Sequence, residues 1–430
     1  MASAPTDRYC QPVRSRYVDL LRAAAIARVL LYHNFGRAWL TIIFPSMGVM
    51  FALAGSLMAA SVEAHGTRYA VSSRVRRLLP PLWAFGLVAV TAMLWAGWSP
   101  HDPVHPLSWP KLILWFIPIG DAEGSQWGAS FWVVLWYLRA YLWLVLITPL
   151  IYLLYRKRWW LAVVAPLVLL AGLVLFGAKA PNTVHNAIWD LAIYGGCWVV
   201  GFAHHDGRLS AVRWPVLLTL AGSLAAGGMT WMLTHTIPPD GDLNDIPVAE
   251  ALWALAFVLV ALRWKPNLDW MDRVPPLSAA VRFVNSRAVT IYLWHNPMIT
   301  VGGALLAVVT IGHIGRWGEP LVFLFDVVLT FLATLAVGWV EDIAARRRPA
   351  LFPVPRESWK LSLKLRERQR VAVGVGEPGD LVATRSRPNP LWALIEPVIV
   401  QKGDPGRGER GDRGGDVGHL PAEDRERLRP

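Results

Sequence analysis

Long apolar stretches are the feature that most restricts how this 430-residue chain can fold. A helix needs about 20 mostly apolar residues to cross the hydrocarbon part of a bilayer. Backbone groups within lipid must be satisfied inside the segment, so each such stretch is expected to be helical. The sequence therefore predicts an all-α, polytopic integral membrane protein of about ten transmembrane helices, at residues 17–35, 38–60, 80–98, 129–154, 159–177, 187–203, 214–233, 248–263, 288–310 and 319–341.

Charged residues are scarce where these stretches lie and frequent after them. Residues 346–430 contain 30 of the charged residues, and the first 345 residues contain 42. The density in the first part is about half that of an ordinary soluble domain, which excludes a soluble multidomain protein. We therefore expect a cytoplasmic N-terminal segment (1–16), a ten-helix transmembrane domain (17–345) and a basic, largely disordered cytoplasmic tail (346–430), which is rich in Gly, Pro and charged residues.

The basic residues predict the orientation of the helices. Alternate connections between the apolar stretches contain seventeen Lys and Arg residues, whereas the other connections contain four. Short loops rich in Lys and Arg stay on the cytoplasmic side. With an even number of spans, both termini are then cytoplasmic, in a multi-pass protein of the cell (inner or plasma) membrane. Because topology and tail account for the net charge of +12, we expect the lipid bilayer and no nucleic acid as a partner.

Ionisable residues in the first stretch form the densest candidate site. A charged group in the hydrocarbon region costs about 2.5–3.5 kcal/mol on insertion scales, so such residues usually serve a function. Asp19 and Arg22 are one helical turn apart, and His33 lies about 20° from Arg22 around the helix axis. These residues predict a polar stripe that lines an internal cavity. The alternative is an interfacial ion pair at one end of the helix and an interfacial histidine at the other.

A cluster of arginines precedes the third stretch. Arg74 and Arg77 are spaced to share one helix face, and guanidinium groups suit two-point contact with phosphate. The alternative interpretation is charge that sets topology and contacts anionic lipids.

Three further polar features interrupt apolar segments. Arg139 must be neutralised or face a cavity, and Asp190 is a buried carboxylate that is a possible partner for an arginine. Residues 295–297 interrupt the ninth stretch, where Pro297 weakens the helix ladder. Residues 204–206, His-His-Asp, lack further ligands at zinc spacing, so we interpret them as a solvated loop and expect no metal site.

Five short motifs, in order along the chain, resemble those of the membrane-bound acyltransferase-3 family. The resemblance covers about residues 17–341 and includes the number of spans. One departure is Ala54, which stands where that family usually has serine. The motifs are Asp19 and Arg22 followed by His33; residues 48–55; Arg74 and Arg77 followed by Pro80; residues 136–139; and residues 291–297.

The resemblance implies an integral O-acyltransferase that moves an acyl group, commonly acetyl, from cytoplasmic acyl-CoA to a hydroxyl of an envelope glycan or glycolipid. Histidine is well suited to take a proton from a hydroxyl near neutral pH. His33 is then the expected general base, with Arg22 and Asp19 setting the electrostatics of its cavity; a transient acyl-histidine is the alternative.

The resemblance also implies binding residues. Arg74 and Arg77 are expected to hold the phosphates of acyl-CoA, which is a co-substrate, so no bound cofactor is expected. Contacts to the thioester or the acceptor are expected from Tyr137, Arg139, His295 and Asn296.

Two other functions fit the same apolar body. One is a transporter or flippase for an envelope lipid or glycan, because ten helices around a polar stripe also permit translocation. The other is a non-catalytic envelope scaffold whose tail recruits partners. Only the enzyme requires His33 for transfer of an acyl group.

Overall fold

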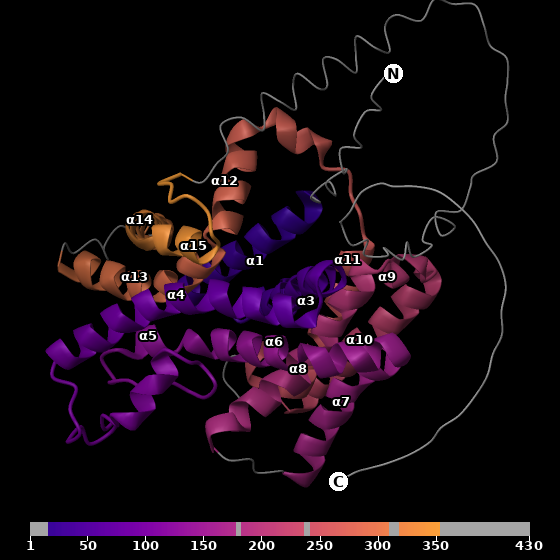
Figure 1. The fold of residues 1–430 in the computed structure, drawn as a ribbon, viewed down its shortest axis with the longest axis horizontal. Helices are drawn as coiled ribbons and strands as arrows, with labels where there is room; N and C mark the ends of the chain where they lie inside the picture. Colours follow the sequence, from indigo (N-terminus) through magenta and orange to yellow (C-terminus); the bar gives the residue numbers. More distant parts are fainter. Residues whose placement is uncertain (1–15, 178–181, 236–240, 309–317, 353–430) are drawn as a thin grey trace, which may run out of the picture. The chain divides into compact units, whose positions relative to one another are not determined.

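The computed structural model describes residues 16–177, 182–235, 241–308 and 318–352, and within them it contains helices and no strand (Figure 1). Each predicted apolar stretch overlaps one long helix. The long helices are α1 (Arg16–Phe35), α3 (Ser46–His65), α4 (Thr67–Trp95), α6 (Leu135–Lys157), α7 (Trp159–Phe176), α8 (Asn182–His205), α10 (Trp214–His235), α11 (Pro247–Arg263), α13 (Ala288–Val308) and α14 (Gly318–Val337).

Shorter helices connect the long ones. The α-helices among them are α2 (Trp39–Ile43), α5 (Ala129–Trp132), α9 (Arg208–Ala211), α12 (Pro275–Ser286) and α15 (Trp339–Ala344). The 3-10 helices are η1 (Pro110–Trp115), η2 (Leu243–Asp245) and η3 (Asp269–Arg273). The predicted N-terminal segment up to residue 15 and the predicted tail from residue 353 lie outside the described residues.

Six helical segments within the described residues are long and apolar enough to cross a membrane. They are Trp39–His65, Thr67–Trp95, Ala129–Lys157, Trp159–Phe176, Trp214–His235 and Gly318–Val337. An all-α, multi-pass membrane protein is thereby confirmed, whereas ten spans stay a prediction. Helix α1 falls outside this set; it contains Asp19, Arg22 and Arg28 within 20 residues.

The third predicted span begins earlier than expected. We placed its start at Pro80, but α4 is continuous from Thr67 through Pro80 and Pro81. A proline removes one backbone hydrogen bond and crowds the preceding turn, yet it does not always end a helix. Here α4 packs against α3, α6 and α15 and buries Ala70, Ser73 and Leu78 before the prolines. The arginine cluster therefore lies on a helix and not in a loop.

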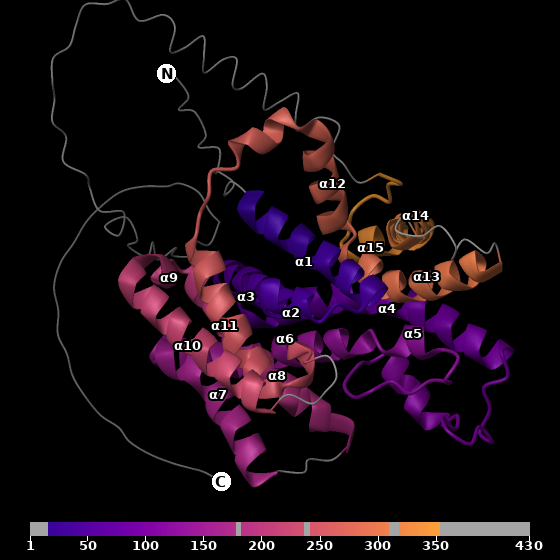
Figure 2. The same ribbon diagram turned by 180° about the vertical axis from the view of Figure 1, so that it is seen from behind.

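Helix α3 is at the centre of the helix packing, beside α1, α8 and α11 (Figures 1 and 2). Small residues allow two helix backbones to approach closely. A Cβ atom at Gly55 would overlap the carbonyl oxygen of Trp198 in α8, and one at Gly201 would overlap that of Ala52. Helices α3 and α8 therefore approach each other closely at these two glycines.

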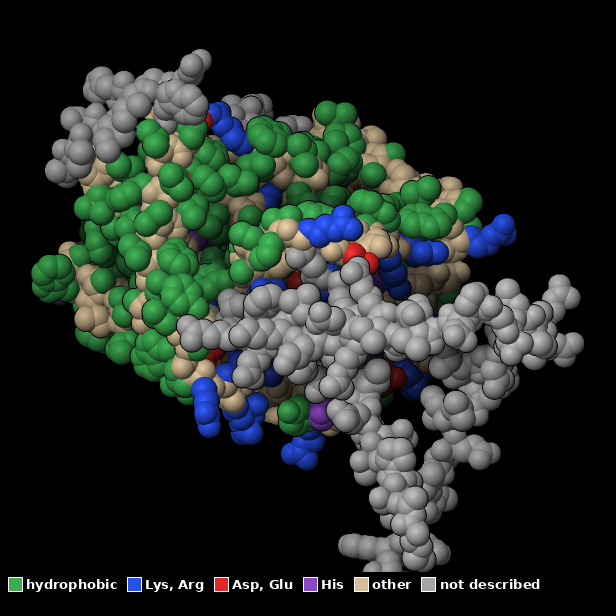
Figure 3. Space-filling model, turned by 90° about the horizontal axis from the view of Figure 1, so that it is seen from above, with side chains coloured by type: hydrophobic (Ala, Val, Ile, Leu, Met, Phe, Trp, Pro, Cys, Tyr) green, Lys and Arg blue, Asp and Glu red, His purple; other side chains and the backbone are tan. Residues whose placement is uncertain are grey.

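Peripheral helices expose apolar side chains. Helices α7, α10 and α14 are only slightly buried, and residues such as Val168, Leu218 and Leu324 are more than half exposed. In the space-filling view, apolar side chains cover a broad part of the face, and most visible Lys and Arg side chains lie beside it (Figure 3). Such a surface suits contact with lipid.

Candidate active site

A basic pocket of about 180 Å³ lies where the first part of α4 faces α1, α6 and α13. Among its lining residues are four arginines, three tyrosines and one carboxylate: Arg22, Arg74, Arg77, Arg347, Tyr137, Tyr141, Tyr292 and Glu341. The structure thus brings together two groups of residues that are far apart in the sequence, the α1 stripe and the arginine cluster. We call this hollow the basic pocket.

The α4 arginines face the pocket together, as their spacing predicts. Arg74 is anchored, because its Nη2 donates a hydrogen bond of 2.8 Å to the carbonyl oxygen of Leu57 in α3. Arg77 is exposed at the pocket. One guanidinium is therefore held in place and the other is open to solvent.

Arg347 was not anticipated by the sequence analysis, which assigned it to the tail. The chain after α15 turns back onto the helices, because Arg287 donates to the Asp342 carboxylate (2.7 Å) and to the carbonyl oxygen of Ala350 (2.5 Å). This places Arg347 at the basic pocket, with its Nε 3.7 Å from Asp342 Oδ1. In the sequence, Arg347 is the middle of three arginines at the start of the predicted tail, and nothing in that pattern points to a pocket.

The α1 stripe divides between two environments. Arg22 lines the basic pocket, and the backbone carbonyl of Asp19 accepts a 2.8 Å hydrogen bond from Asn285 in α12. His33, in the last turn of α1, instead faces His295, with ring centroids 5.0 Å apart. The three residues therefore do not border one hollow in the way the stripe predicts.

A line of rings connects the basic pocket to the histidines. The ring of Tyr137 is 4.8 Å from that of Tyr292, which is 5.6 Å from His295, and His295 faces His33. Side chains on α6, α13 and α1 thus form a continuous path of contacts. All four residues of this path belong to the sequence motifs described above.

His295 is fully buried and its tautomer follows from one contact. Its Nδ1 lies 2.6 Å from the carbonyl oxygen of Tyr292. Because a carbonyl only accepts, Nδ1 carries the proton and the neutral ring has its lone pair on Nε2. That Nε2 atom is buried and has no hydrogen-bond partner among the described residues. A neutral histidine with an unused lone pair is chemically able to accept a proton.

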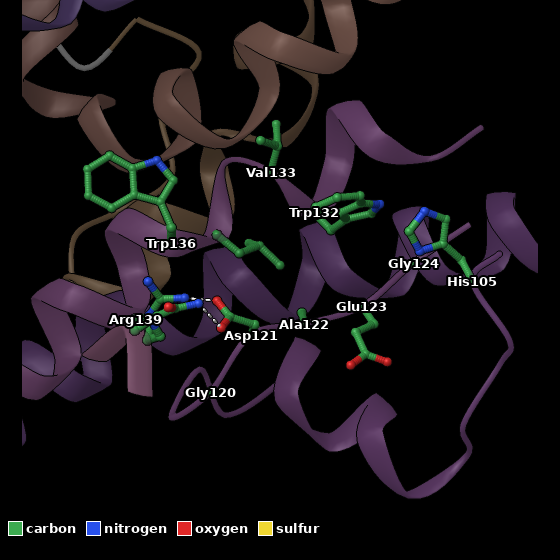
Figure 4. A pocket seen from close by; sticks show the side chains of 12 residues that line it. His105, Gly120, Asp121, Ala122, Glu123, Gly124, Trp132, Val133, Trp136 and Arg139 are labelled. Carbon is green, nitrogen blue, oxygen red and sulfur yellow. Dashed lines mark hydrogen bonds and ion pairs between the residues drawn. The ribbon is translucent and has the colours of Figure 1, made fainter. Parts of the chain in front are cut away.

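Arg139 is neutralised by carboxylates, as expected for an arginine in an apolar helix. Its Nη2 and Nε lie 2.7 and 3.1 Å from Asp190 Oδ2, so Asp190 does pair with an arginine and that arginine is Arg139. It also forms an ion pair with Asp121, which is drawn in Figure 4. Asn296 lies elsewhere, and its side-chain amide donates a hydrogen bond of 3.1 Å to the backbone carbonyl oxygen of Ser130 in α5. Neither residue lines the basic pocket.

The described residues contain no group of three or more His, Cys, Asp and Glu side chains that could hold a metal ion. Each of the two histidines at the end of α8 contacts a different side chain. His204 contacts Ser56 (2.9 Å) and His205 contacts Glu63 (2.7 Å).

Comparison with known protein families identifies a matching family model. A family model described as an acyltransferase domain, acyltransferase-3, matches residues 15–339, which is more than half of the chain. No curated protein and no solved structure matches the chain.

Proposed function

Because the chain belongs to the membrane acyltransferase-3 family, we propose that it is an O-acyltransferase that takes its acyl group from acyl-CoA and transfers it to a hydroxyl of an envelope glycan or glycolipid. The observation that carries this proposal is the basic pocket, where four arginines meet beside a line of rings that ends at two histidines.

The charge of the basic pocket favours a donor that carries phosphates. Four guanidinium groups and one carboxylate, Glu341, line it. The Glu341 carboxylate already has hydrogen-bond partners, since its Oε2 accepts from the hydroxyl and the backbone N–H of Thr290. CoA has a pyrophosphate and a 3′-phosphate, and arginines bind such groups by charge-assisted hydrogen bonds. Two arginines come from α4, one from α1 and one from the segment after α15.

The size of the pocket limits which part of the donor enters. Small-molecule sites usually measure about 300–1,000 Å³, and this one is about 180 Å³. In the proposed complex the thioester arm enters toward Tyr137 and Tyr292, whereas the nucleotide stays at the mouth with Arg77 and Arg347. The acyl group then points toward the histidines.

The proposed chemistry is a direct acyl transfer. His33 accepts the proton of the acceptor hydroxyl, the oxygen attacks the thioester carbonyl, the C–S bond breaks, and the CoA thiolate receives the proton. General-base catalysis of this kind contributes about 10²–10⁴ in rate. His295, oriented by the Tyr292 carbonyl, is the neighbour that positions His33. Arg22 lies at the basic pocket, about 16 Å along α1 from His33, and adds positive charge on the donor side.

The proposed topology puts this donor pocket on the side where acyl-CoA is made. In a ten-span arrangement with both termini in the cytoplasm, the α4 arginines, the start of α1 and the segment after α15 are all at the cytoplasmic end. The pocket is lined by residues from each of these segments.

Donor binding and transfer can be tested on the purified protein in lipid nanodiscs with radiolabelled acetyl-CoA. The proposal predicts that the double variant Arg74→Ala, Arg77→Ala binds acetyl-CoA far more weakly than the wild type. The matched control is Arg68→Ala, Arg76→Ala, which removes the same charge from the same helix but at a different hollow. Equal weakening in both variants would return the α4 arginines to a role in topology alone.

A further inference from the structure

A second hollow, of about 360 Å³, lies at the start of α6, beside the connection from α4 to α5. Its polar and aromatic lining residues are His105, Asp121, Glu123, Trp132, Trp136, Arg139 and Asn186. We call it the loop pocket. Figure 4 shows Arg139 and Asp121 pointing toward each other on one side, with Trp132, His105 and Glu123 on the other. The function proposed above does not use this hollow.

The connection that builds the loop pocket is tied down by indole side chains. Trp98 Nε1 donates to the carbonyl oxygen of His105 (2.7 Å), and Trp115 Nε1 donates to that of Glu123 (2.9 Å). Trp143 in α6 makes a similar bond to Ile119 (2.9 Å). A binding site whose walls are already held in place spends less free energy on ordering when a ligand arrives.

A turn closed by Asp102 orients His105 at the rim. The backbone N–H groups of His105 and Val104 donate to Asp102 Oδ1 at 2.9 and 3.0 Å, and they hold the pKa of this exposed carboxyl below its usual value. The turn is therefore stabilised by a charged acceptor near neutral pH.

The lining chemistry suits a compound with many hydroxyl groups. Trp132 and Trp136 offer flat apolar faces, on which the C–H face of a sugar ring can stack. The amide nitrogen of Asn186 already donates to Asp121 Oδ2 (2.7 Å), which leaves the Asn186 carbonyl oxygen and the Glu123 carboxylate as acceptors for ligand hydroxyl groups. The volume falls within the range of about 300–1,000 Å³ that is common for small ligands.

The charges of the loop pocket disfavour an anionic ligand. Arg139 is its one described lining cation, and that guanidinium is already shared by Asp190 and Asp121. Glu123 is partly compensated by Lys111, 2.6 Å away. With these neighbours included, the loop pocket has the three carboxylates of Asp121, Asp190 and Glu123 and the two cations of Arg139 and Lys111. The basic pocket has four arginines and one carboxylate. A phosphate would therefore prefer the basic pocket.

The loop pocket adjoins the proposed catalytic rings. Trp136 lines the loop pocket and the next residue, Tyr137, lines the basic pocket, so the start of α6 is the wall between them. Helix α5, which carries Trp132, is bonded through Ser130 to Asn296, the neighbour of His295. An acceptor in the loop pocket would thus lie next to the line of rings, with the first turn of α6 between it and the donor.

We propose that the loop pocket binds the hydroxyl-bearing acceptor and selects a neutral, polyhydroxylated compound, a sugar residue, over an anionic one. This inference rests on the proposed O-acyltransferase function.

The test uses the full-length protein in nanodiscs and a panel of methyl glycosides of common hexoses and N-acetylhexosamines as probes. Binding is measured by saturation-transfer NMR without donor, and transfer is measured with radiolabelled acetyl-CoA. We expect at least one glycoside to bind and to be acylated. We also expect sn-glycerol 3-phosphate to bind at least tenfold more weakly than that glycoside.

Variants assign the binding to the pocket. Glu123→Gln keeps the size of the side chain and should weaken glycoside binding by about tenfold, because one charge-assisted hydrogen bond is lost. Trp136→Phe keeps an aromatic ring but reduces its area, and it should also weaken glycoside binding. The control for the first variant is Glu319→Gln, which changes an exposed carboxylate that is paired with Arg37. The control for the second is Trp109→Phe, which changes an exposed indole of the α4–α5 connection that does not line the pocket.

The outcomes separate this inference from the proposed function. Acetyl-CoA binding should be unchanged in Glu123→Gln and Trp136→Phe. Failure of every glycoside to bind, equal effects in the control variants, or preference for the phosphate would overturn the acceptor site while leaving donor binding intact. Absence of acetyl-CoA binding in the wild type would instead overturn the proposed function itself.

Discussion

The basic pocket and the loop pocket share the first turns of α6 as a wall, but they are built in different ways. The basic pocket collects side chains from segments as distant as α1 and the chain after α15. The loop pocket is built mainly by one connection and the helix that follows it. Four arginines line the first, and the second has one arginine that carboxylates already neutralise. This difference in charge would sort a phosphate-bearing donor from a neutral acceptor.

The largest effect is expected from His33, which the proposal places between the two substrates. His33→Ala should lower acyl transfer by about 10²–10⁴, because the acceptor hydroxyl loses its base. Binding of acetyl-CoA and of the glycoside should each stay near wild type. Radiolabel transfer and equilibrium binding measure these quantities on the same preparation. Transfer at wild-type rates would favour a transporter or a scaffold.

The next effect concerns the donor side alone. Arg74→Ala with Arg77→Ala should raise the Kd for acetyl-CoA on the order of 10²-fold, since two charge-assisted contacts are lost. Affinity for the glycoside should not change. Isothermal titration of both ligands checks the prediction, and the variant Arg68→Ala, Arg76→Ala serves as its control. A loss of glycoside affinity would show that the two pockets are not separate.

A smaller effect is expected from Arg347, which lies beyond the residues that the family model matches. Arg347→Ala should weaken acetyl-CoA binding by about tenfold through loss of one partly exposed phosphate contact. Its neighbours in sequence, Arg346 and Arg348, are exposed and do not line the pocket, so alanine there is the matched control. If all three variants bind alike, residues after α15 take no part in donor binding.

The smallest effect comes from salt, and it applies to the wild type. Raising the ionic strength from about 0.05 to 0.5 M shortens the Debye length and screens exposed charges. Acetyl-CoA affinity should fall several-fold, whereas glycoside affinity should stay constant. Titrations at the two salt concentrations give both values. A parallel fall for the glycoside would mean that charge, and not hydroxyl recognition, governs the loop pocket.

Much of the helix framework could be predicted from the sequence, because apolar length and small residues act locally. Where a helix differs from its prediction, tertiary contacts are the cause. Pro80 and Pro81 looked like the start of a span, but burial of the preceding turns of α4 keeps the helix continuous. That Arg139 would be neutralised was predictable, since an arginine in an apolar helix needs a partner, whereas its pairing with Asp190 is seen only in the structure.

Other parts of the site depend on long-range contacts that no local pattern encodes. Arg347 reaches the basic pocket only because Arg287 binds Asp342 and Ala350. The lone pair on Nε2 of His295 follows from the backbone contact of Nδ1, which depends on the three-dimensional structure. The loop pocket combines residues of the α4–α5 connection with Asn186 from α8, so its composition was not visible in the sequence.

The central claim is that donor and acceptor occupy separate pockets on two sides of α6. A double-mutant cycle tests it most directly, with steady-state transfer measured for the wild type, Arg74→Ala with Arg77→Ala, Glu123→Gln, and the combination. Independent sites give additive free-energy changes. We predict that the arginine variant raises only the KM for acetyl-CoA, that Glu123→Gln raises only the KM for the glycoside, and that the effects add. A rise of the same KM in both variants would contradict the account.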